Sequence, residues 1–194
     1  MKVEDSGMPH ESYWNSLFNI EGIIAWLPPT EATAKIVEIG CGYGTFTLPL
    51  AKMPQRNIHT FDIESSMIDI ARHNATDAGL SNIRFEQRDV LEQGTGLEER
   101  SVDIVFLFNI LHFEEKGVFL EEAARILKRG GTAAIVHWRT DIPTPRGPAV
   151  STRPDAAQIL EAAKGLDLHY DGVSGTLEPY HWGMQLAKGT DHGG

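Results

Sequence analysis

The sequence predicts an α/β protein with a doubly wound, mostly parallel sheet and helices on both faces. Three observations support this: short apolar runs alternate with segments of helical periodicity, a glycine turn follows the first run, and an aspartate ends or follows each of the next two runs. Alternating strands and helices favour parallel strands joined by right-handed crossovers. In open sheets of this kind, ligands bind beyond the carboxyl ends of the strands.

Five apolar runs are interpreted as the parallel strands. Residues 83–88 alternate apolar and polar side chains, as a half-buried strand does, whereas residues 102–108 form a nearly unbroken apolar run that is typical of a buried parallel strand. The five strands are expected at residues 36–39, 58–63, 83–88, 102–108 and 132–138.

Helical spacing and capping residues predict the helices. Pro28-Pro29 ends the leading helix, and Ser65-Ser66 can cap a later one. Gly79 and the pair Gly130-Gly131 are each placed to end a helix. The helices are expected at residues 10–28, 46–52, 65–78, 118–127 and 155–164.

The C-terminal part has a different character. Residues 139–154 are rich in proline and arginine and are expected to form an ordered loop over the sheet, and two last strands are expected at 166–170 and 180–187. A chain of 194 residues is long enough for one sizeable core. We therefore expect a single domain over residues 1–188 and a flexible tail over 189–194.

Bulk composition excludes several classes of protein. The chain is 41% apolar and 23% charged, as globular proteins are, and no apolar run reaches the ~20 residues that span a bilayer. The polar, acidic stretch from Met1 to Pro9 is not a secretory signal, and the lone Cys41 excludes an internal disulfide, so we expect a reducing, cytoplasmic setting without membrane association. The net charge of −10 argues against a nucleic-acid partner, although an acidic protein can carry a local basic patch.

The glycine turn after the first strand is the most informative motif. Gly40, Gly42 and Gly44 follow Glu38, and their missing Cβ atoms let a ligand approach the backbone closely. A dinucleotide fingerprint needs a glycine where Thr45 stands, and a carboxylate would repel a pyrophosphate. The same carboxylate would attract an ammonium or sulfonium group. The turn therefore favours a zwitterionic or cationic nucleotide derivative over NAD.

The second strand ends in an acidic residue that suits a ribose. Asp62 stands 22 residues after Gly40, where a carboxylate can accept both ribose hydroxyls. The alternative is a helix N-cap or a solvated aspartate in a turn.

Five motifs together resemble the class I S-adenosylmethionine-dependent methyltransferases, in particular their small, single-domain, type 11- and type 12-like members. The resemblance covers roughly residues 35–138. It implies a Rossmann-like, seven-stranded sheet that ends in an antiparallel hairpin, a place that 166–170 and 180–187 fit. It also implies S-adenosyl-L-methionine as cofactor and S-adenosyl-L-homocysteine as product. The motifs are the glycine turn, Phe61-Asp62-Ile63 with the following Ser-Ser-Met, Arg88-Asp89-Val90, residues 101–105 and residues 127–131.

The resemblance assigns expected roles around the cofactor. Asp89 would accept the adenine amino group, and the Val90 N–H would meet a ring nitrogen. Ile63 and Met67 would sandwich the adenine, or else belong to the core. Glu38 would hold the ligand's amino group directly or through water, or would accept N–H groups of the glycine turn. The expected cofactor-binding residues are Glu38, Gly40, Gly42, Gly44, Asp62, Ile63, Met67, Asp89, Val90 and Asn109, the last against the methionine part.

Methyl transfer is an in-line displacement, so the enzyme must position the acceptor, exclude water and, for some acceptors, remove a proton. His112 and His137 are the candidate catalytic bases, with packed histidines as the alternative. Arg139 and Arg146 could bind a substrate carboxylate or phosphate, or could pin the proline-rich loop to acidic residues. In similar proteins the leading helix closes over the cofactor. The expected substrate-binding residues are Tyr13, Trp14, Trp138, Arg139, Arg146 and His181.

Several methyltransferase subclasses are disfavoured by the residues at the ends of the fourth and fifth strands. Residues 109–112 carry neither the Asn/Asp-Pro-Pro-aromatic motif of adenine-N enzymes nor the Pro-Cys nucleophile of cytosine-C5 enzymes, and residues 137–139 lack the metal-binding acids of catechol-type enzymes. We therefore expect a metal-independent enzyme that methylates a small molecule, as a monomer or homodimer. The alternatives are an RNA or protein methyltransferase, a non-catalytic S-adenosylmethionine-binding module, and an NAD-linked oxidoreductase, which Thr45 and Glu38 oppose.

Overall fold

The computed structural model describes residues 8–29, 33–53, 56–112 and 114–190. Its centre is a seven-stranded sheet with the order β3-β2-β1-β4-β5-β7-β6. The first five strands along the chain pair in parallel, and β7 pairs antiparallel with both β5 and β6. This confirms the predicted mostly parallel sheet and its C-terminal hairpin. The strands are β1 Lys35–Ile39, β2 Asn57–Asp62, β3 Ile83–Gln87, β4 Val102–Phe108, β5 Leu127–Trp138, β6 Leu168–Leu177 and β7 His181–Lys188.

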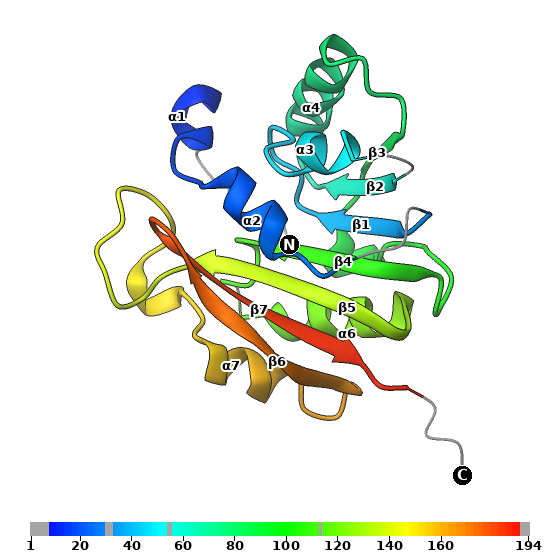
Figure 1. The fold of residues 1–194 in the computed structure, drawn as a ribbon, viewed down its shortest axis with the longest axis vertical. Coiled ribbons are helices and arrows are strands. Elements are labelled where there is room, and N and C mark those ends of the chain that lie inside the picture. The colour runs from blue at the N-terminus through cyan, green and yellow to red at the C-terminus, as the bar shows by residue number, and fades with distance from the viewer. Residues whose placement is uncertain (1–7, 30–32, 54–55, 113, 191–194) are drawn as a thin grey trace.

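Helices cover both faces of the sheet (Figure 1). The buried side chains of α2 and α3 pack with Ile104, Phe106 and Phe108 of β4, and those of α6 and α7 pack with Val105 and Leu107 of the same strand. Because both faces are covered, β4 is apolar along nearly its whole length. The helices are α1 Glu11–Asn15, α2 Ile20–Trp26, α3 Thr47–Ala51, α4 Ser65–Asp77, α5 Val90–Gln93, α6 Lys116–Ile126 and α7 Ala156–Ala162, with a short 3-10 turn at Val150–Thr152.

The expected leading helix over residues 10–28 is two helices instead of one. Helix α1 ends at Asn15, and α2 starts after Asn19, whose Oδ1 accepts the Gly22 N–H at 3.0 Å. An asparagine at this position favours a helix start because it satisfies an N–H group that lacks a partner within the helix. Periodicity across residues 10–28 therefore describes one apolar face that two separate helices share.

The glycine pair at 130–131 does not end α6, which is another difference from the prediction. Helix α6 ends at Ile126, and β5 starts directly at Leu127. Gly130 has φ +74°, and a Cβ on Gly131 would lie 2.9 Å from the Asp103 carbonyl oxygen, beside the register shift between β4 and β5. The glycines thus allow an irregular start of a strand.

The start of α4 also differs from the prediction. Its N-cap is Glu64, whose side chain makes no capping hydrogen bond, and Ser65 and Ser66 already lie in the first turn. The Glu64 N–H is instead accepted by Asp62 Oδ1 at 3.0 Å. Gly79, with φ +67°, follows the end of the helix as expected.

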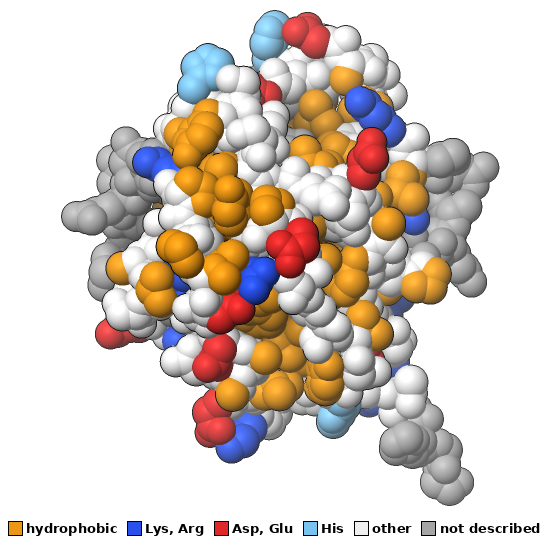
Figure 2. Space-filling model, turned by 60° about the vertical axis from the view of Figure 1, so that its left-hand side comes forward, with side chains coloured by type: hydrophobic (Ala, Val, Ile, Leu, Met, Phe, Trp, Pro, Cys, Tyr) orange, Lys and Arg blue, Asp and Glu red, His pale blue; other side chains and the backbone are white. Residues whose placement is uncertain are grey.

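The remaining expectations concern the chain's ends and surface. Of the expected tail, residues 191–194 lie outside the described residues. Within the described ranges, none of the helices has the length and apolar character to cross a membrane. Figure 2 shows the face that brings α1 and the 139–154 loop forward, and on it Lys and Arg side chains lie scattered among Asp and Glu without a basic patch.

Candidate cofactor and acceptor site

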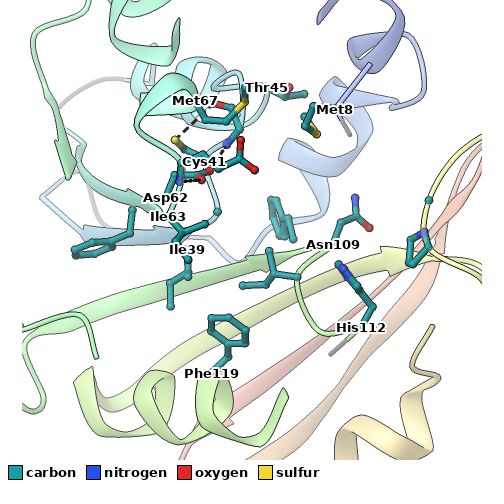
Figure 3. Close-up of a pocket in the computed structure, with 18 of the residues that line it drawn as sticks. Met8, Ile39, Cys41, Thr45, Asp62, Ile63, Met67, Asn109, His112 and Phe119 are labelled. Atoms are coloured by element: carbon teal, nitrogen blue, oxygen red, sulfur yellow. Dashed lines mark hydrogen bonds between the residues drawn. The ribbon is translucent and has the colours of Figure 1, made fainter. Parts of the chain in front are cut away.

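The carboxyl ends of β1, β2, β3, β4 and β5 meet around one cavity of about 1290 Å³. Figure 3 shows Asp62 and Ile63 on one side of this cavity and Asn109 and His112 on the other. The structure thus brings together most of the residues predicted from the sequence. Those that line the cavity are Trp14, Gly40, Gly42, Asp62, Ile63, Met67, Asp89, Val90, Asn109, His112, Trp138 and Arg146.

The glycine turn forms the floor of the cavity beside β1. Gly40 has φ +86°, and a Cβ there would lie 2.8 Å from Ile110 Cγ2. Gly40 and Gly42 line the cavity, whereas Gly44 packs against Leu48 and Ala71. The turn therefore needs glycine at Gly40 for both its left-handed backbone and its close packing.

Asp62 connects the glycine turn to the start of α4. Its Oδ2 accepts the Gly42 N–H at 2.9 Å, and its Oδ1 accepts the Glu64 N–H at 3.0 Å. Burial raises the pKa of Asp62, and the backbone N–H donors offset part of that rise. A carboxylate has about four acceptor positions, so lone pairs remain for two ribose hydroxyls. Neither alternative describes Asp62, because the N-cap of α4 is Glu64 and the Asp62 side chain is half-buried and accepts two backbone N–H groups; the ribose role stays a prediction.

Asp89 is the N-cap of α5, a short helix that sequence reasoning missed. Its Oδ1 accepts the N–H groups of Leu91 at 3.0 Å and Glu92 at 3.3 Å. Asp89 and the buried Val90 line the cavity together with Ile63 and Met67. Ile63 and Met67 are half-buried and lie outside the buried core, which favours the expected ligand contact over the core alternative. Their adenine roles stay predictions.

Glu38 is placed differently from expectation. It is 1% exposed, does not line the cavity, and accepts the hydroxyls of Thr47 and, at 3.1 Å, Thr60. Burial raises its pKa to about 7. The N–H groups of Gly40 and Cys41 go to the Phe61 carbonyl at 2.8 and 3.1 Å, so Glu38 is not the acceptor for the turn. In this arrangement a direct contact with a ligand's amino group is blocked, and only the contact through water stays a prediction.

Asn109 ends β4 in a left-handed conformation, with φ +58°. Its N–H donates to the Val136 carbonyl at 2.8 Å, which ties the bend to β5. Its Oδ1 and Nδ2 are buried, and neither has a hydrogen-bond partner among the described residues. Because a buried amide without a partner costs free energy, its position on the cavity indicates a polar ligand.

The two candidate bases lie in different environments. His112 lines the cavity, and burial lowers its pKa. His137 is fully buried behind it, with ring centroids 5.9 Å apart, and burial lowers its pKa to about 3. The structure does not bring His137 to the cavity, and a packed histidine describes its position. A base role for His112 stays a prediction.

Three expected acceptor contacts also lie outside the cavity. Tyr13 is 44% exposed and does not line it. Arg139 pairs with Asp141 at 2.7 Å and Glu178 at 3.2 Å, which is the loop-pinning alternative. His181 is fully buried, stacks on Phe18 and packs in a tilted arrangement against Trp138. Residues of β7 alternate between the two faces of the sheet, and His181 lies on the face that packs against these rings.

Sequence reasoning missed several residues that line the acceptor end. They are Phe46, Phe108, Thr144, Pro145, Gly147, Pro148 and the buried Arg153. The only signal was the concentration of proline and arginine in residues 139–154. Across the described ranges, no three His, Cys, Asp or Glu side chains gather to hold a metal ion, and metal independence stays a prediction.

Fold and cavity together define an α/β protein that binds a nucleoside-type ligand at the switch point of its sheet. A family model described as a methyltransferase domain matches residues 36–131. In structure, the chain is similar to an S-adenosylmethionine-dependent methyltransferase from Aquifex aeolicus, with a TM-score of 0.78, 21% identity, and coverage of 92% of this chain and 93% of that one. The chain thus carries a methyltransferase domain, and the match is consistent with the class I S-adenosylmethionine-dependent methyltransferases. This agrees with the predicted family and the predicted fold.

Curated relatives include enzymes that act on different acceptors. The 27-O-demethylrifamycin SV methyltransferase of Amycolatopsis mediterranei is 24% identical over 167 residues, 81% of this chain and 59% of that protein. The 23S rRNA (uracil(1939)-C(5))-methyltransferase of Pseudomonas putida is 33% identical over 90 residues, 45% of this chain and 20% of that protein. The chain thus spans a fifth to about three fifths of the length of these relatives.

Proposed function

We propose that this chain binds S-adenosyl-L-methionine and transfers its methyl group to a small molecule. The observation that carries the proposal is the size and continuity of the cavity. It extends from Asp89 at one end to Trp138 and Arg153 at the other, and its volume of about 1290 Å³ exceeds the ~300–1,000 Å³ typical of a pocket for one ligand. The cofactor and an acceptor can therefore share it.

The cofactor end fits the family's cofactor in its donor and acceptor groups. Asp62 would accept the ribose hydroxyls, and Asp89 would accept the adenine amino group. Gly40 would let the methionine part lie against the backbone, because a Cβ there has no room. The buried amide of Asn109 would gain the partners it lacks within the described part of the chain.

The bound cofactor supplies an electrophilic methyl carbon with a thioether leaving group. The protein's task is then to place the acceptor in line and to exclude water. Trp14 and Trp138 close one side of the acceptor end, and residues 144–148 close another. His112 lines the same space and would take a proton from an acceptor that needs to lose one.

A small-molecule acceptor is favoured over RNA by charge. Across the whole chain the net charge is −10, and the face in Figure 2 shows no basic patch. The rifamycin-type relative matches 81% of this chain, against 45% for the ribosomal RNA enzyme, so the first match extends over the acceptor end as well. RNA or protein methylation remains the second candidate function because the ribosomal RNA enzyme is also a relative.

Two measurements test the proposal. Calorimetry should show binding of S-adenosyl-L-methionine and S-adenosyl-L-homocysteine, without competition by NAD. Transfer of a labelled methyl group is then measured in parallel against a small-metabolite extract, total RNA and denatured protein, with label expected only in the first. Absence of cofactor binding at millimolar concentration would refute the proposal, and binding without label in any fraction would indicate a non-catalytic module.

A further inference from the structure

Arg153 is a buried cation at the acceptor end that lacks a carboxylate partner. Its side chain lines the cavity, the residue is 7% exposed, and no acid among the described residues forms an ion pair with it. By contrast Arg88, which also lines the cavity, pairs with Glu86 at 2.7 Å. A buried charge is costly unless an opposite charge accompanies it. The position of Arg153 therefore indicates an anion that the protein itself does not provide.

The contacts of Arg153 hold it in place without using all its donors. Its Nε donates to the Pro148 carbonyl at 2.9 Å, its Nη1 to the Arg139 carbonyl at 2.8 Å, and its Nη2 to the Arg146 carbonyl at 3.4 Å. A guanidinium has five N–H donors, so these three bonds leave two for another acceptor. The three carbonyls all belong to the 139–154 loop, which makes the guanidinium part of a fixed frame.

The electrostatic surroundings of Arg153 add no negative charge. Burial, with a smaller contribution from the Arg153 charge, lowers the pKa of His137 and of His181 to about 3, so both rings are neutral near pH 7. The ring of Trp138 lies beneath the guanidinium, with its centroid 6.0 Å from Cζ. Such a ring attracts a cation weakly and cannot replace a carboxylate.

Beside Arg153 the cavity has an aromatic wall, made of Trp14, Phe46, Phe108 and Trp138. Ring centroids of Trp14 and Trp138 are 6.1 Å apart, and those of Phe46 and Phe108 are 4.8 Å apart, both pairs edge to face. Edge-to-face pairs are a stable arrangement, so the wall is preformed. Phe46, Phe108 and Trp138 are nearly fully buried and Trp14 is half-buried, so the wall gives this end of the cavity an apolar, aromatic lining.

From these observations we infer that the methyl acceptor is an aromatic acid, whose ring packs on the aromatic wall and whose carboxylate is held by Arg153. The inference rests on the proposed function and specifies its substrate class. The carboxylate would receive charge-assisted hydrogen bonds from a rigid donor frame. A neutral aromatic compound of the same shape would leave Arg153 buried without a counter-ion.

The test uses the full chain saturated with S-adenosyl-L-homocysteine and two matched probes, 2-naphthoate and 2-naphthamide. Calorimetry should show the carboxylate binding at least roughly tenfold more tightly than the amide, which is the usual gain from a charged partner. Arg153→Gln should remove this preference, and Arg153→Lys should keep part of it. Arg72→Gln, which removes the same charge from the exposed side of α4 away from the cavity, should leave the preference intact.

Each result supports or overturns the inference. Equal affinity for the two probes, or no carboxylate binding at millimolar concentration, would overturn it even if the Arg153 variants fail to fold, because both results come from the unchanged protein. A preference that survives in Arg153→Gln would also overturn it. Failure of S-adenosyl-L-homocysteine to bind in the first titration would instead reject the proposed function.

Discussion

The two ends of the cavity are built in different ways. At the cofactor end, backbone N–H groups hold the two carboxylates in place: Asp89 accepts from its own turn, and Asp62 accepts from its own turn and from the glycine turn after the neighbouring strand. At the acceptor end, side chains from α1, β4, β5 and the 139–154 loop meet only through long-range packing. There the buried guanidinium of Arg153 lacks a carboxylate partner among the described residues. The cofactor end is thus organised by its own backbone hydrogen bonds, and the acceptor end is completed by its ligand.

The largest effect on ligand affinity is expected at the cofactor end of the cavity. Asp62→Ala should weaken S-adenosyl-L-homocysteine binding by about 2–4 kcal/mol, roughly 30- to 700-fold, because both ribose hydroxyls and the Gly42 N–H lose their acceptor. Calorimetry measures the change. Asp69→Ala on the exposed side of α4 is the matched control. Equal affinities of the two variants for S-adenosyl-L-homocysteine would show that Asp62 does not bind the cofactor.

A second prediction concerns the carboxyl beneath the glycine turn. Burial raises the pKa of Glu38 from 4.5 to about 7, so the folded protein holds this proton more tightly than the unfolded chain does. Its contribution to stability is therefore greatest below pH 4.5 and is lost as the pH rises toward 7. Glu38→Gln keeps an oxygen acceptor for Thr47 and Thr60 and should be more stable than the parent above pH 7, by on the order of 3 kcal/mol, and not at pH 4.5.

Urea unfolding of both proteins between pH 4.5 and 8 measures this difference. The pH dependence that other titrating groups share cancels when the variant is compared with the parent. A constant difference across this range would mean that Glu38 is charged in the folded protein, and the cofactor end would then carry a buried anion beside Asp62.

The third prediction separates ligand contact from packing at Asn109. Asn109→Gly keeps the left-handed backbone, which glycine adopts without strain, and removes an amide that has no partner among the described residues. The free energy of unfolding should change by less than about 1 kcal/mol, because no hydrogen bond of the side chain is lost. Affinity for S-adenosyl-L-homocysteine should fall by about 0.5–1.5 kcal/mol, the usual worth of one hydrogen bond. Loss of stability with unchanged affinity would instead make the amide a packing residue.

The same contrast explains what could be predicted from the sequence. The glycine turn, Asp62 and Asp89 could be predicted because each stands at or just after the end of a strand that the sequence pattern marks, and β4 could be predicted because burial on both faces makes it continuously apolar. Helix boundaries near Asn19 and Gly130-Gly131 were predicted wrongly, because a cap or a bulge can override periodicity. Arg153 could not be found, since its burial depends on contacts with the 139–154 loop and Trp138.

Tyr13 and Trp14 are neighbours on α1. Substituting them one at a time gives the smallest expected effect and the sharpest test of the acceptor end. Sequence spacing places Tyr13 and Trp14 on one helix without deciding which of them faces the cavity, and in the structure only Trp14 does so. Tyr13→Ala should change the free energy of unfolding by no more than about 0.5 kcal/mol, because its ring is exposed. It should also leave 2-naphthoate binding unchanged, while Trp14→Ala weakens it by removing part of the aromatic wall. Calorimetry and urea unfolding on the two variants measure both quantities. Equal losses of 2-naphthoate affinity would show that α1 turns when the acceptor binds, and the acceptor end would then be less preformed than its ring contacts indicate.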